Sequence, residues 1–434
     1  MRSRAFLKQK IAALVQIDPA TLPYNEEFLS WLRDEKKSGR KIIMTTASDL
    51  KMARSVADHV GLFDEVLASD GNTNLRSTIK LRVLTEKFGE RGFDYAGNSS
   101  ADFAVWRGAR AAIVVNAGPA IEKEAATCTT IDRVFEPAAS PLSASIRCLR
   151  PHQWGKNLII FVPIIAAHKM ADPSLLLRGF WAFIVFCVCA SGVYVINDLM
   201  DLEADRRHST KRLRPFASGD LPLPIGLVAG PLLLVAGLLA AVELSWLFAG
   251  VVALYLILTT TYTWQIKRVV LLDVFFLTGL YTIRLVAGHA ATGILYSAWL
   301  LMFSMFIFLS LALVKRYVEL AANKEINPGN AAITGRGYVP GDLELVTSLG
   351  TCSGFIAALV LALYVNSQQV VALYAQPNLL LLLCPLLLYW ISRVWLLAHR
   401  RQLHDDPVLF AVKDATSYVI GALALAVLWF AAGH

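Results

Sequence analysis

The sequence has few cysteines, and none is placed as a metal site or a disulfide framework requires. The thiols are scattered, and the one close pair lies in an apolar run, where the two side chains would face different sides of a helix. The residues concerned are Cys128, Cys148, Cys187, Cys189, Cys352 and Cys384. We therefore interpret them as packing residues, which removes cysteine-based metal centres and disulfide scaffolds from the candidate classes.

The beginning of the chain also lacks the features of a cleavable secretory signal. The first residues are basic and amphipathic, with no continuous apolar core before a small-residue cleavage site. Charged residues make up only 17% of the chain, while 56% is hydrophobic, which is unusual for a soluble protein of 434 residues. The net charge of +8 does not indicate nucleic acid, because the basic residues of the second half lie between apolar stretches.

Residues 1–140 lack long apolar runs and predict a small α/β domain with a linker at its end. Helices are expected over 5–16, 26–37 and 49–60 and around Lys80, and short strands over 41–46, 63–69, 93–97 and 111–116. Strands that alternate with helices predict a parallel sheet of Rossmann type. The segment 136–143 has the composition of a linker to the second domain, residues 141–434.

Polar residues of this domain resemble motifs of the haloacid dehalogenase superfamily. A hydroxyl follows the 41–46 strand, at Thr46 or Thr45, and Lys80 and the loop from Gly97 to Asp102 match the later motifs. The resemblance implies a phosphatase-like fold.

The chain departs from that family in two places. No D-x-D motif on a first strand precedes Lys41, and Asn98 stands where the metal-binding aspartate is expected. A phosphoaspartate mechanism cannot run without its nucleophile, so we predict a degenerate domain without phosphatase activity. Loss of the central first strand should leave a gap, or let the strands at 41–46 and 93–97 pair directly. A truncated start would give the same pattern, and the sequence alone does not separate these explanations.

The second domain has apolar runs long enough to cross a membrane, and we expect about nine such helices. They lie at 157–171, 175–197, 222–242, 245–261, 269–288, 296–314, 345–364, 378–397 and 414–432. Alternate connections are rich in Lys and Arg, which predicts that they are cytoplasmic, in a bacterial inner membrane. The N-terminal domain would share that side, and an odd number of spans would place His434 outside.

An acidic motif follows the second run directly. Asp198, Asp201 and Asp205 are spaced so that they share one face of a helix. Three carboxylates on one face repel each other unless a cation lies among them, and hard oxygen ligands suit Mg²⁺ that bridges to substrate phosphates. The cations Lys211, Arg212 and Arg214 follow, and suit the same phosphates. The alternative is a solvated charged loop at the membrane surface.

Two further cytoplasmic connections carry polar residues. One begins with Tyr262 and Lys267, and the span after it contains Asp273 and Arg284, which should face the bundle interior and have partners there. The other contains Lys315, Arg316 and Glu319 within about one turn. The alternative for the cations is that they extend from helix ends to the membrane surface. Upstream, the segment 149–157 predicts an interfacial helix with Trp154 at headgroup level and its cations toward water.

These motifs resemble the UbiA superfamily of intramembrane prenyltransferases over residues 145–434. The carrying residues are N-D-x-x-D-x-x-x-D at 197–205, K-R-x-R-P at 211–215, and Tyr262 with Lys267. The decaprenyl-phosphate phosphoribosyltransferase branch is especially similar, through R-P-x-Q-W-x-K-N at 150–157 and K-R-Y-x-E-L at 315–320. The resemblance implies an all-α bundle around a central cavity, Mg²⁺ as cofactor and a polyprenyl lipid substrate.

One departure from the aromatic prenyltransferases bears on function. Those enzymes carry a second aspartate-rich motif after the sixth span, where this chain has Lys315 and Arg316. We therefore expect transfer of 5-phosphoribose from phosphoribosyl diphosphate to a polyprenyl phosphate. The alternatives are transfer of a prenyl chain from its diphosphate to a ring acceptor, and a non-catalytic membrane scaffold. A transporter is disfavoured, because the polar motifs cluster on one side.

The predicted site residues fall into three groups. Catalysis is assigned to Asp198, Asp201, Lys211 and Arg212. Substrate binding is assigned to Asn197, Arg214, Tyr262, Lys267, Arg284, Lys315, Arg316 and Glu319. The metal ligands would be Asp198, Asp201 and Asp205. The expected partners are membrane lipids and the phosphorylated donor, with no nucleic acid.

Overall fold

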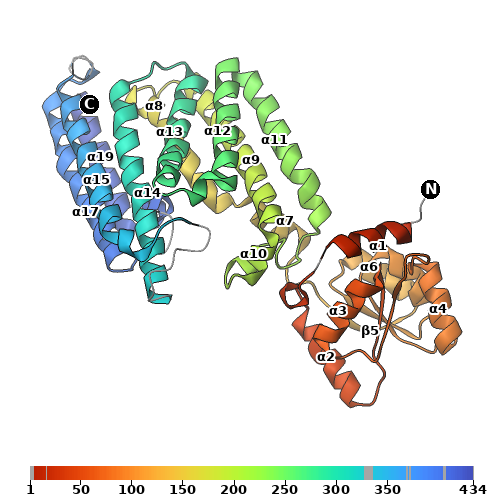
Figure 1. Ribbon diagram of the computed structural model, residues 1–434. Helices are drawn as coiled ribbons and strands as arrows, with labels where there is room; N and C mark the ends of the chain where they lie inside the picture. The colour runs from red at the N-terminus through yellow and green to blue at the C-terminus, as the bar shows by residue number, and fades with distance from the viewer. Residues whose placement is uncertain are drawn as a thin grey trace. The chain divides into compact units, whose positions relative to one another are not determined.

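A computed structural model describes residues 4–15, 17–326, 336–367, 370, 373–403 and 407–433. The chain forms two compact units (Figure 1). The N-terminal unit comprises Met1–Cys148 and Asp198–Ile225, and the membrane unit comprises Leu149–Asn197 and Gly226–His434. The segment that begins with the acidic motif therefore packs with the N-terminal unit, whereas the sequence led us to expect it within the membrane domain.

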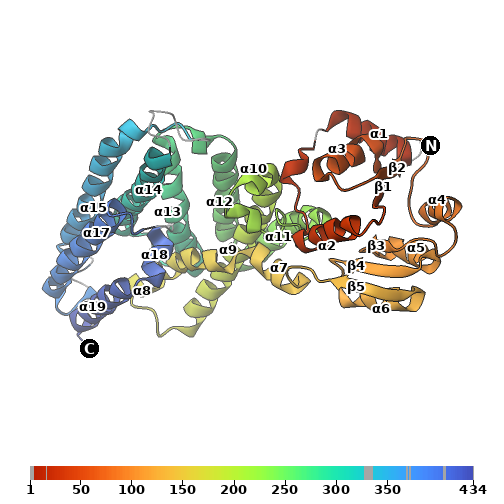
Figure 2. The same ribbon diagram turned by 90° about the horizontal axis from the view of Figure 1, so that it is seen from below.

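The N-terminal unit is an α/β structure with parallel strands (Figure 2). Its strands are β1 (Ile43–Asp49), β2 (Glu65–Ser69), β3 (Tyr95–Gly97), β4 (Ala111–Val115) and β5 (Thr130–Phe135). Its helices are α1 (Arg4–Leu14), α2 (Glu26–Lys37), α3 (Leu50–Val60), α4 (Thr78–Phe88), α5 (Phe103–Gly108), α6 (Pro119–Cys128) and α7 (Pro141–Leu149), the last of which ends at the next unit. The small parallel α/β region is the one that the sequence predicted.

Local chemistry explains why these helices begin where they do. Asn25 precedes α2, and its side-chain oxygen accepts a hydrogen bond from the Phe28 amide at 2.9 Å. Asp49 caps α3 in the same way through the Lys51 amide. Such caps satisfy amide groups that have no partner within the helix. The core below them holds Trp106, Val105 and Val114, which are fully buried.

The strands form two sheets instead of one. β1 pairs with β2, while β3, β4 and β5 form a separate sheet in that order. Among the described residues β1 and β3 are not paired, so the direct pairing of these strands, one of the two expected outcomes, is not observed. The split between the two sheets corresponds to the other expected outcome, a gap. The haloacid dehalogenase resemblance itself stays a prediction.

In the described chain, eight helices are long and apolar enough to cross a membrane. They are α9 (Pro173–Met200), α11 (Leu223–Leu244), α12 (Trp246–Trp264), α13 (Leu272–Thr292), α14 (Ala298–Ile326), α15 (Leu343–Val365), α17 (Leu383–His399) and α19 (Ala415–Ala432). The short helix α18 (Pro407–Lys413) precedes the last of them. The predicted fold class, a polytopic helical bundle after a small α/β domain, is confirmed.

The first expected span, 157–171, takes a different form. It is divided into an 11-residue 3₁₀ segment, η3 (Pro151–Phe161), and a short helix, α8 (Val162–Ala166). This segment packs closely on α13, because a Cβ at Gly288 would lie 2.2 Å from the Ile160 carbonyl oxygen. Apolarity alone predicted a continuous span here and did not reveal this break. His434, which was expected outside, lies beyond the described residues.

Candidate functional site

The acidic motif lies at a break between two helices. Helix α9 ends at Met200, and the short helix α10 (Leu202–Arg207) begins after Asp201. Asp198 and Asp205 are buried, and both contact Nη1 of Arg214, at 3.2 and 2.5 Å. The shared partner brings these two carboxylates together, although the single helix face expected for all three aspartates is interrupted at Asp201. Asp201 lies half-buried at the junction.

The chemistry of this donor set suits a hard divalent cation. Three carboxylates offer oxygen donors, which Mg²⁺ prefers. In this structure the positive charge between Asp198 and Asp205 is the guanidinium of Arg214. No three His, Cys, Asp or Glu side chains are grouped as a metal site in the part of the chain that is described. The metal assignment therefore stays a prediction.

The other predicted cations of this segment are accessible. Lys211 and Arg212 are exposed on the 3₁₀ turn η4 (Lys211–Leu213). This segment is part of the N-terminal unit and packs against the first residues of the chain in that unit. Arg207 forms an ion pair with Asp18 at 3.3 Å, and Gly219 lies against Pro23, where a Cβ would come within 3.1 Å of the ring.

The membrane unit contains a polar cavity of about 320 Å³. Four of its lining residues are cations, and the described lining includes no Asp or Glu. The lining consists of Arg150, Gln153, Lys156, Val193, Tyr194, Asn197, Tyr255, Thr259, Tyr262, Thr263, Leu277, Leu280, Tyr281, Arg284 and Lys315. Asn197, one of the lining residues, belongs to α9 and precedes Asp198 in the sequence. The lining brings together Asn197, Tyr262, Arg284 and Lys315 of the predicted site residues, whose roles stay predictions.

Aromatic rings and one amide hold the cations of the cavity. Arg284 is buried in α13, where its Nε donates to Oδ1 of Asn157 at 2.8 Å and its guanidinium lies 5.2 Å from the Tyr255 ring. The Lys156 ammonium lies 5.8 Å from the ring of Tyr281. Cations over aromatic faces are attracted by the ring quadrupole. The prediction that Arg284 has a partner inside the bundle is confirmed.

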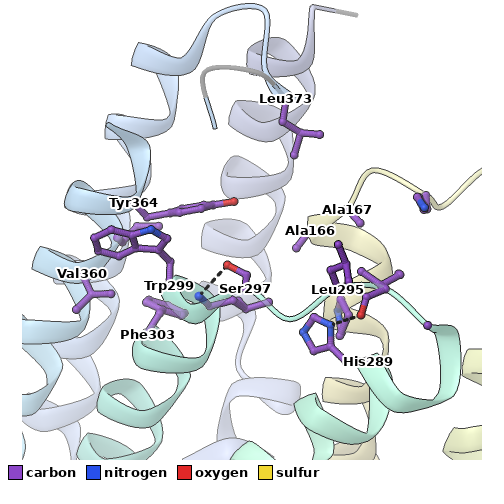
Figure 3. Close-up of a pocket in the computed structure, with 16 residues that line it drawn as sticks. Ala166, Ala167, His289, Leu295, Ser297, Trp299, Phe303, Val360, Tyr364 and Leu373 are labelled. Atoms are coloured by element: carbon purple, nitrogen blue, oxygen red, sulfur yellow. Dashed lines mark hydrogen bonds between the residues drawn. The ribbon is translucent and has the colours of Figure 1, made fainter. Parts of the chain in front are cut away.

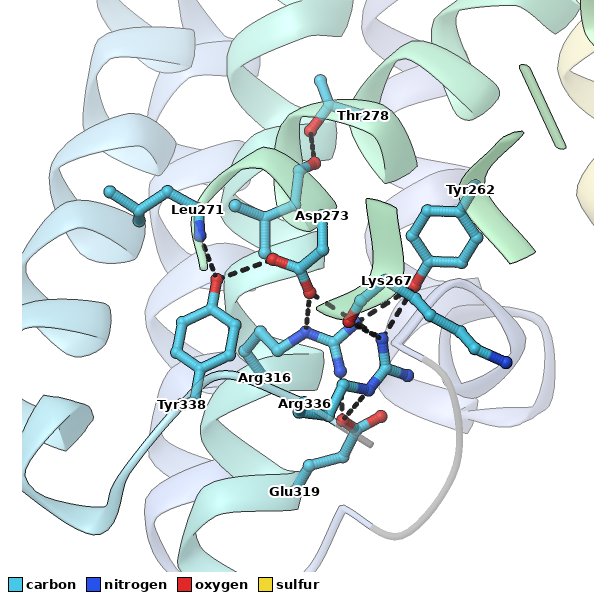
Figure 4. Close-up of polar contacts among 10 residues, drawn as sticks. Tyr262, Lys267, Leu271, Asp273, Thr278, Arg316, Glu319, Arg336 and Tyr338 are labelled. Carbon is cyan, nitrogen blue, oxygen red and sulfur yellow. Dashed lines mark hydrogen bonds and ion pairs between the residues drawn. The ribbon is translucent and has the colours of Figure 1, made fainter. Parts of the chain in front are cut away.

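A buried network of charges lies beside this cavity (Figure 4). Arg316 is fully buried, with its Nε 2.6 Å from Oδ2 of Asp273, and it also pairs with Glu319. Arg336 lies 3.8 Å from Asp273 and 3.7 Å from Glu319. Two carboxylates thus face two guanidinium groups, which is the pairing that buried charge requires. The interior partner predicted for Asp273 is confirmed.

Two tyrosines complete the network. The Tyr338 hydroxyl donates to Oδ1 of Asp273 at 2.7 Å and accepts from the Leu271 amide at 2.9 Å. Burial, together with that carboxylate, raises the pKa of Tyr338, so the phenol stays protonated. The Tyr262 hydroxyl accepts from Arg316 at 3.3 Å and from Arg336 at 3.1 Å. Tyr262 also lines the cavity, so it connects the network to the cavity wall.

Four residues predicted to bind substrate therefore lie outside the cavity lining. One is Arg214, which contacts the carboxylates of the acidic motif. Arg316 and Glu319 are members of the network, and Lys267 contributes its carbonyl oxygen, which accepts from Arg336 at 3.3 Å. The Lys267 ammonium points away from the arginines (Figure 4). Lys315, next to Arg316 in sequence, lines the cavity instead. Sequence spacing alone did not separate these neighbouring cations.

The sequence reasoning did not assign Arg150, Gln153 and Lys156 to the site, although they line the cavity. Trp154, in the same segment, donates through Nε1 to the Ser191 hydroxyl at 3.1 Å. The expected position of this segment along the membrane surface stays a prediction. The R-P-x-Q-W-x-K-N pattern was the available signal, because its polar positions fall at 150, 153, 156 and 157.

The residues that resemble haloacid dehalogenase motifs are bonded to one another. Lys80 Nζ donates to the Tyr95 hydroxyl at 2.7 Å, and that hydroxyl donates to Oδ1 of Asp102 at 2.9 Å. Oδ2 of Asp102 accepts from the amides of Asn98 and Ser99 and from the Ser99 hydroxyl. Burial lowers the pKa of Lys80, which the charge of Asp102 partly opposes. We call these residues the Lys80–Tyr95–Asp102 cluster.

This fold and these motifs define a class of integral membrane transferase. The sequence pattern of the UbiA prenyltransferase family matches residues 158–418, and the chain belongs to that family. A solved UbiA homologue from Archaeoglobus fulgidus, bound to GPP and Mg²⁺, is 14% identical, with a TM-score of 0.49 over 65% of this chain and 99% of that one.

Several relatives are more similar in sequence. An uncharacterized protein, y4nM of Sinorhizobium fredii, is 39% identical over 97% of this chain and 82% of its own length. The nodulation protein NoeC of Azorhizobium caulinodans is 36% identical over 67% of this chain and 94% of its own length. The decaprenyl-phosphate phosphoribosyltransferase of Mycolicibacterium smegmatis is 37% identical, but the match spans 44% of this chain and 63% of that enzyme.

Proposed function

We propose that this protein transfers 5-phosphoribose from phosphoribosyl diphosphate to a polyprenyl phosphate and releases diphosphate. The observation that carries the proposal is the cavity lined by Arg150, Lys156, Arg284 and Lys315, with no carboxylate in its described lining. Such a surface suits anionic groups on both substrates. The similarity to the M. smegmatis phosphoribosyltransferase supports the same donor and acceptor.

The reaction needs charge neutralisation more than proton transfer. Departure of diphosphate from the anomeric carbon leaves an oxocarbenium-like centre, which a phosphate oxygen of the acceptor attacks. That oxygen is already ionised at neutral pH, so no strong general base is required. The cavity agrees, because its described lining contains no His, Asp or Glu and instead supplies cations. Lys211 and Arg212 are further candidates to contact a phosphate.

A magnesium ion would be held by Asp198, Asp201 and Asp205, with Asn197 as an orienting or ligating amide. When bound, it would supply positive charge to the leaving diphosphate. Arg214 contacts two of these carboxylates in the structure.

Prenyl transfer to an aromatic ring is the second candidate, but the network beside the cavity disfavours it. That chemistry in the resembling enzymes uses a second carboxylate cluster. Here Asp273 and Glu319 are the carboxylates nearest to that place, and arginines neutralise both. A ring acceptor would also leave the four cavity cations without an equivalent role.

Two labelled donor and acceptor pairs offered to the same purified protein test the proposal. We expect phosphoribosyl diphosphate with polyprenyl phosphate to yield a phosphoribosylated lipid, detected by mass spectrometry. Product from polyprenyl diphosphate with an aromatic acid, and none from the first pair, would establish prenyl transfer instead. Lack of product from either pair in folded preparations would favour a scaffold.

We also propose that the acidic motif and the basic connections are cytoplasmic, in a bacterial inner membrane. The support is the Lys and Arg bias of alternate connections, which include residues 206–214, 267–268 and 315–316. A cysteine introduced at Arg214 should resist an impermeant thiol reagent in intact cells and react after lysis. Labelling of this cysteine from outside would show that the protein has the opposite orientation in the membrane.

A further inference from the structure

The segment that carries the acidic motif is held by residues near the start of the chain. Arg207 is on α10, the short helix that also contains Asp205, and its Nη2 lies 3.3 Å from Oδ2 of Asp18. The elements that α10 contacts most extensively are η4 and the 3₁₀ turn η1 (Pro19–Thr21). All of these residues belong to the N-terminal unit. That unit therefore supplies a partner for the helix that follows the membrane span α9.

Local hydrogen bonds stabilise the turn that Asp18 begins. The other carboxylate oxygen of Asp18, Oδ1, accepts from an amide of η1 at 3.1 Å and caps the turn. The Tyr24 hydroxyl donates to the carbonyl oxygen of Pro19 at 2.9 Å, and the Tyr24 ring stacks on His59 of α3 at 6.0 Å. One oxygen of Asp18 thus holds the turn while the other meets Arg207, so α10 is connected to the body of the α/β unit.

Two further contacts hold the segment beyond Arg214. Gly219 has a φ of +80°, and a Cβ at this position would lie 3.1 Å from the Pro23 ring. The next residue, Asp220, forms an ion pair with Arg147 of α7 at 2.6 Å, and its side chain is only 10% exposed. The chain from α10 to Asp220, which includes Arg214, is therefore attached to the N-terminal unit at both of its ends.

The helix α10 depends on such contacts for its position. It has six residues, and a helix this short is not stable by itself in water. Asp205 on this helix is buried, with Oδ2 2.5 Å from Nη1 of Arg214. A carboxylate that is to bind Mg²⁺ must be held close to its productive position, because this ion requires nearly ideal octahedral geometry. The contacts that fix α10 therefore bear on the metal ligand that it carries.

We propose that the N-terminal unit is a positioning domain for the acidic motif, in which Asp18 positions the metal ligand Asp205 through Arg207. The inference rests on the magnesium-binding role proposed for that motif. Asp18 and Arg207 act on the helix and are not themselves ligands. This role requires no phosphatase chemistry from the α/β unit, which agrees with the internal hydrogen bonds of its Lys80–Tyr95–Asp102 cluster.

Two measurements on the purified full chain test this proposal. One is hydrogen exchange in the peptide that covers α10, and the other is binding of Mn²⁺, a paramagnetic probe of the magnesium site, followed by electron paramagnetic resonance. Asp18→Asn keeps an oxygen that can cap η1 but removes the charge that Arg207 meets. Because an exposed ion pair contributes modestly, we expect exchange about threefold faster and Mn²⁺ binding about threefold weaker.

Two other variants sharpen the test. Arg207→Gln should have the same effects as Asp18→Asn. The double variant should be no worse than either single variant, since all three remove the same contact. In each variant the Mg²⁺ concentration for half-maximal turnover should rise about threefold, with the rate at saturating Mg²⁺ retained, because the bound ion restores the position of Asp205.

Glu203→Gln is the matched control, because Glu203 pairs with the same Arg207 at 3.0 Å but lies on α10 itself. It should leave Mn²⁺ binding unchanged. Lys169→Ala is a distant control. Lys169 is an exposed cation that precedes α9, whereas the acidic motif lies at the other end of that helix. It lines a separate, mostly apolar cavity of about 520 Å³ around the C-terminal end of α13 in the membrane unit (Figure 3), and its removal should change neither measurement.

The possible outcomes separate this proposal from the proposed function. Equal Mn²⁺ affinity in wild type, Asp18→Asn and Arg207→Gln would overturn the positioning role and leave the metal assignment intact. Faster exchange with unchanged Mn²⁺ binding would show that the contact is only structural, which also overturns it. A further loss in the double variant would show that the two side chains do not act through one contact. If the wild-type protein did not bind Mn²⁺, the metal assignment itself would be wrong, and the positioning role would be rejected with it.

Discussion

The Lys80–Tyr95–Asp102 cluster and the cation-lined cavity use similar residue types in opposite ways. In the N-terminal unit the lysine, tyrosine and aspartate bond to one another, and the carboxylate also accepts from two amides and a serine. In the membrane unit Arg150, Lys156, Arg284 and Lys315 line a cavity whose described wall has no acid. Polar groups that hydrogen-bond to one another stabilise a fold, while cations that line a cavity can neutralise an anionic ligand.

The same contrast recurs between neighbours in one helix. Arg316 is fully buried between Asp273 and Glu319, whereas Lys315 lines the cavity. Adjacent positions on an α-helix point about 100° apart, which is enough to give one cation a structural role and the other a place at the cavity. Variants that remove one charge at a time should separate the two roles.

The largest effect is expected at the acidic motif. Asp198→Asn and Asp201→Asn each remove a charge at nearly constant shape, and we expect turnover to fall about a thousandfold, ~4 kcal/mol of transition-state stabilisation. The measurement is product formation at saturating Mg²⁺. Glu203→Gln is the control, because Glu203 is exposed on α10 and forms an ion pair with the exposed Arg207. Near-normal turnover by both aspartate variants would reject the metal assignment.

The next effect concerns stability. Asp273→Asn leaves Arg316 buried with one carboxylate fewer, and we expect a loss of about 3 kcal/mol. Thermal unfolding in detergent should show this as a clearly lower melting temperature. The double variant Asp273→Asn with Arg316→Met removes both charges, so it should recover part of the loss. Asp172→Asn, in the exposed connection before α9, should change little. Equal melting of wild type and Asp273→Asn would show that the network is not structural.

A smaller effect is expected from the cavity cations. Lys156→Met and Lys315→Met keep most of the side-chain volume, and each should raise the KM for a phosphorylated substrate about tenfold, ~1.4 kcal/mol. The melting temperature should stay close to that of wild type. Lys123→Met, an exposed change on α6, provides the matched control. A lower melting temperature with unchanged KM would show that these lysines stabilise the fold, as Arg316 is expected to do, and do not bind substrate.

Periodicity and chemistry in the sequence were enough for most of the fold. The helix predicted at 26–37 has the bounds of α2, which Asn25 caps in the structure. Asp273 and Arg284 were correctly placed inside the bundle, because isolated charge in an apolar span needs a partner. The roles predicted for the site residues remain predictions.

Other features depend on contacts that no local pattern encodes. The 157–171 stretch is apolar enough for a span, yet tight packing on Gly288 accompanies a 3₁₀ segment and a short helix. The split between Lys315 and Arg316 depends on Asp273, which is far away in sequence. The place of Arg336 and Tyr338 in the network depends on a connection with no motif of its own.

The smallest effect on catalysis is expected in the Lys80–Tyr95–Asp102 cluster. The wild-type protein should not hydrolyse p-nitrophenyl phosphate, and Asp102→Ala should leave that background and the transferase rate unchanged. The variant should instead loosen the N-terminal unit by about 1–3 kcal/mol, because buried donors lose their acceptor. Faster hydrogen exchange in peptides covering β3 and α5 would report this. If the wild-type protein showed phosphatase turnover and Asp102→Ala abolished it, the cluster would be catalytic, and its difference from the cation-lined cavity would no longer hold.

Lys80 adds a dependence on pH whose sign follows from its surroundings. Burial lowers its pKa below the ordinary 10.5, and the charge of Asp102 opposes that lowering. The unfolded chain therefore binds the Lys80 proton more tightly than the folded chain does. The stability of the N-terminal unit, and with it the protection of its amides from hydrogen exchange, should rise with pH between the lowered pKa of Lys80 and 10.5. Asp102→Ala removes the opposing charge and should widen that window downward, while Lys80→Met should remove this contribution. Hydrogen exchange, corrected for its intrinsic pH dependence, distinguishes these outcomes. If Asp102→Ala narrowed the window instead, Asp102 would not be the charge that keeps Lys80 protonated.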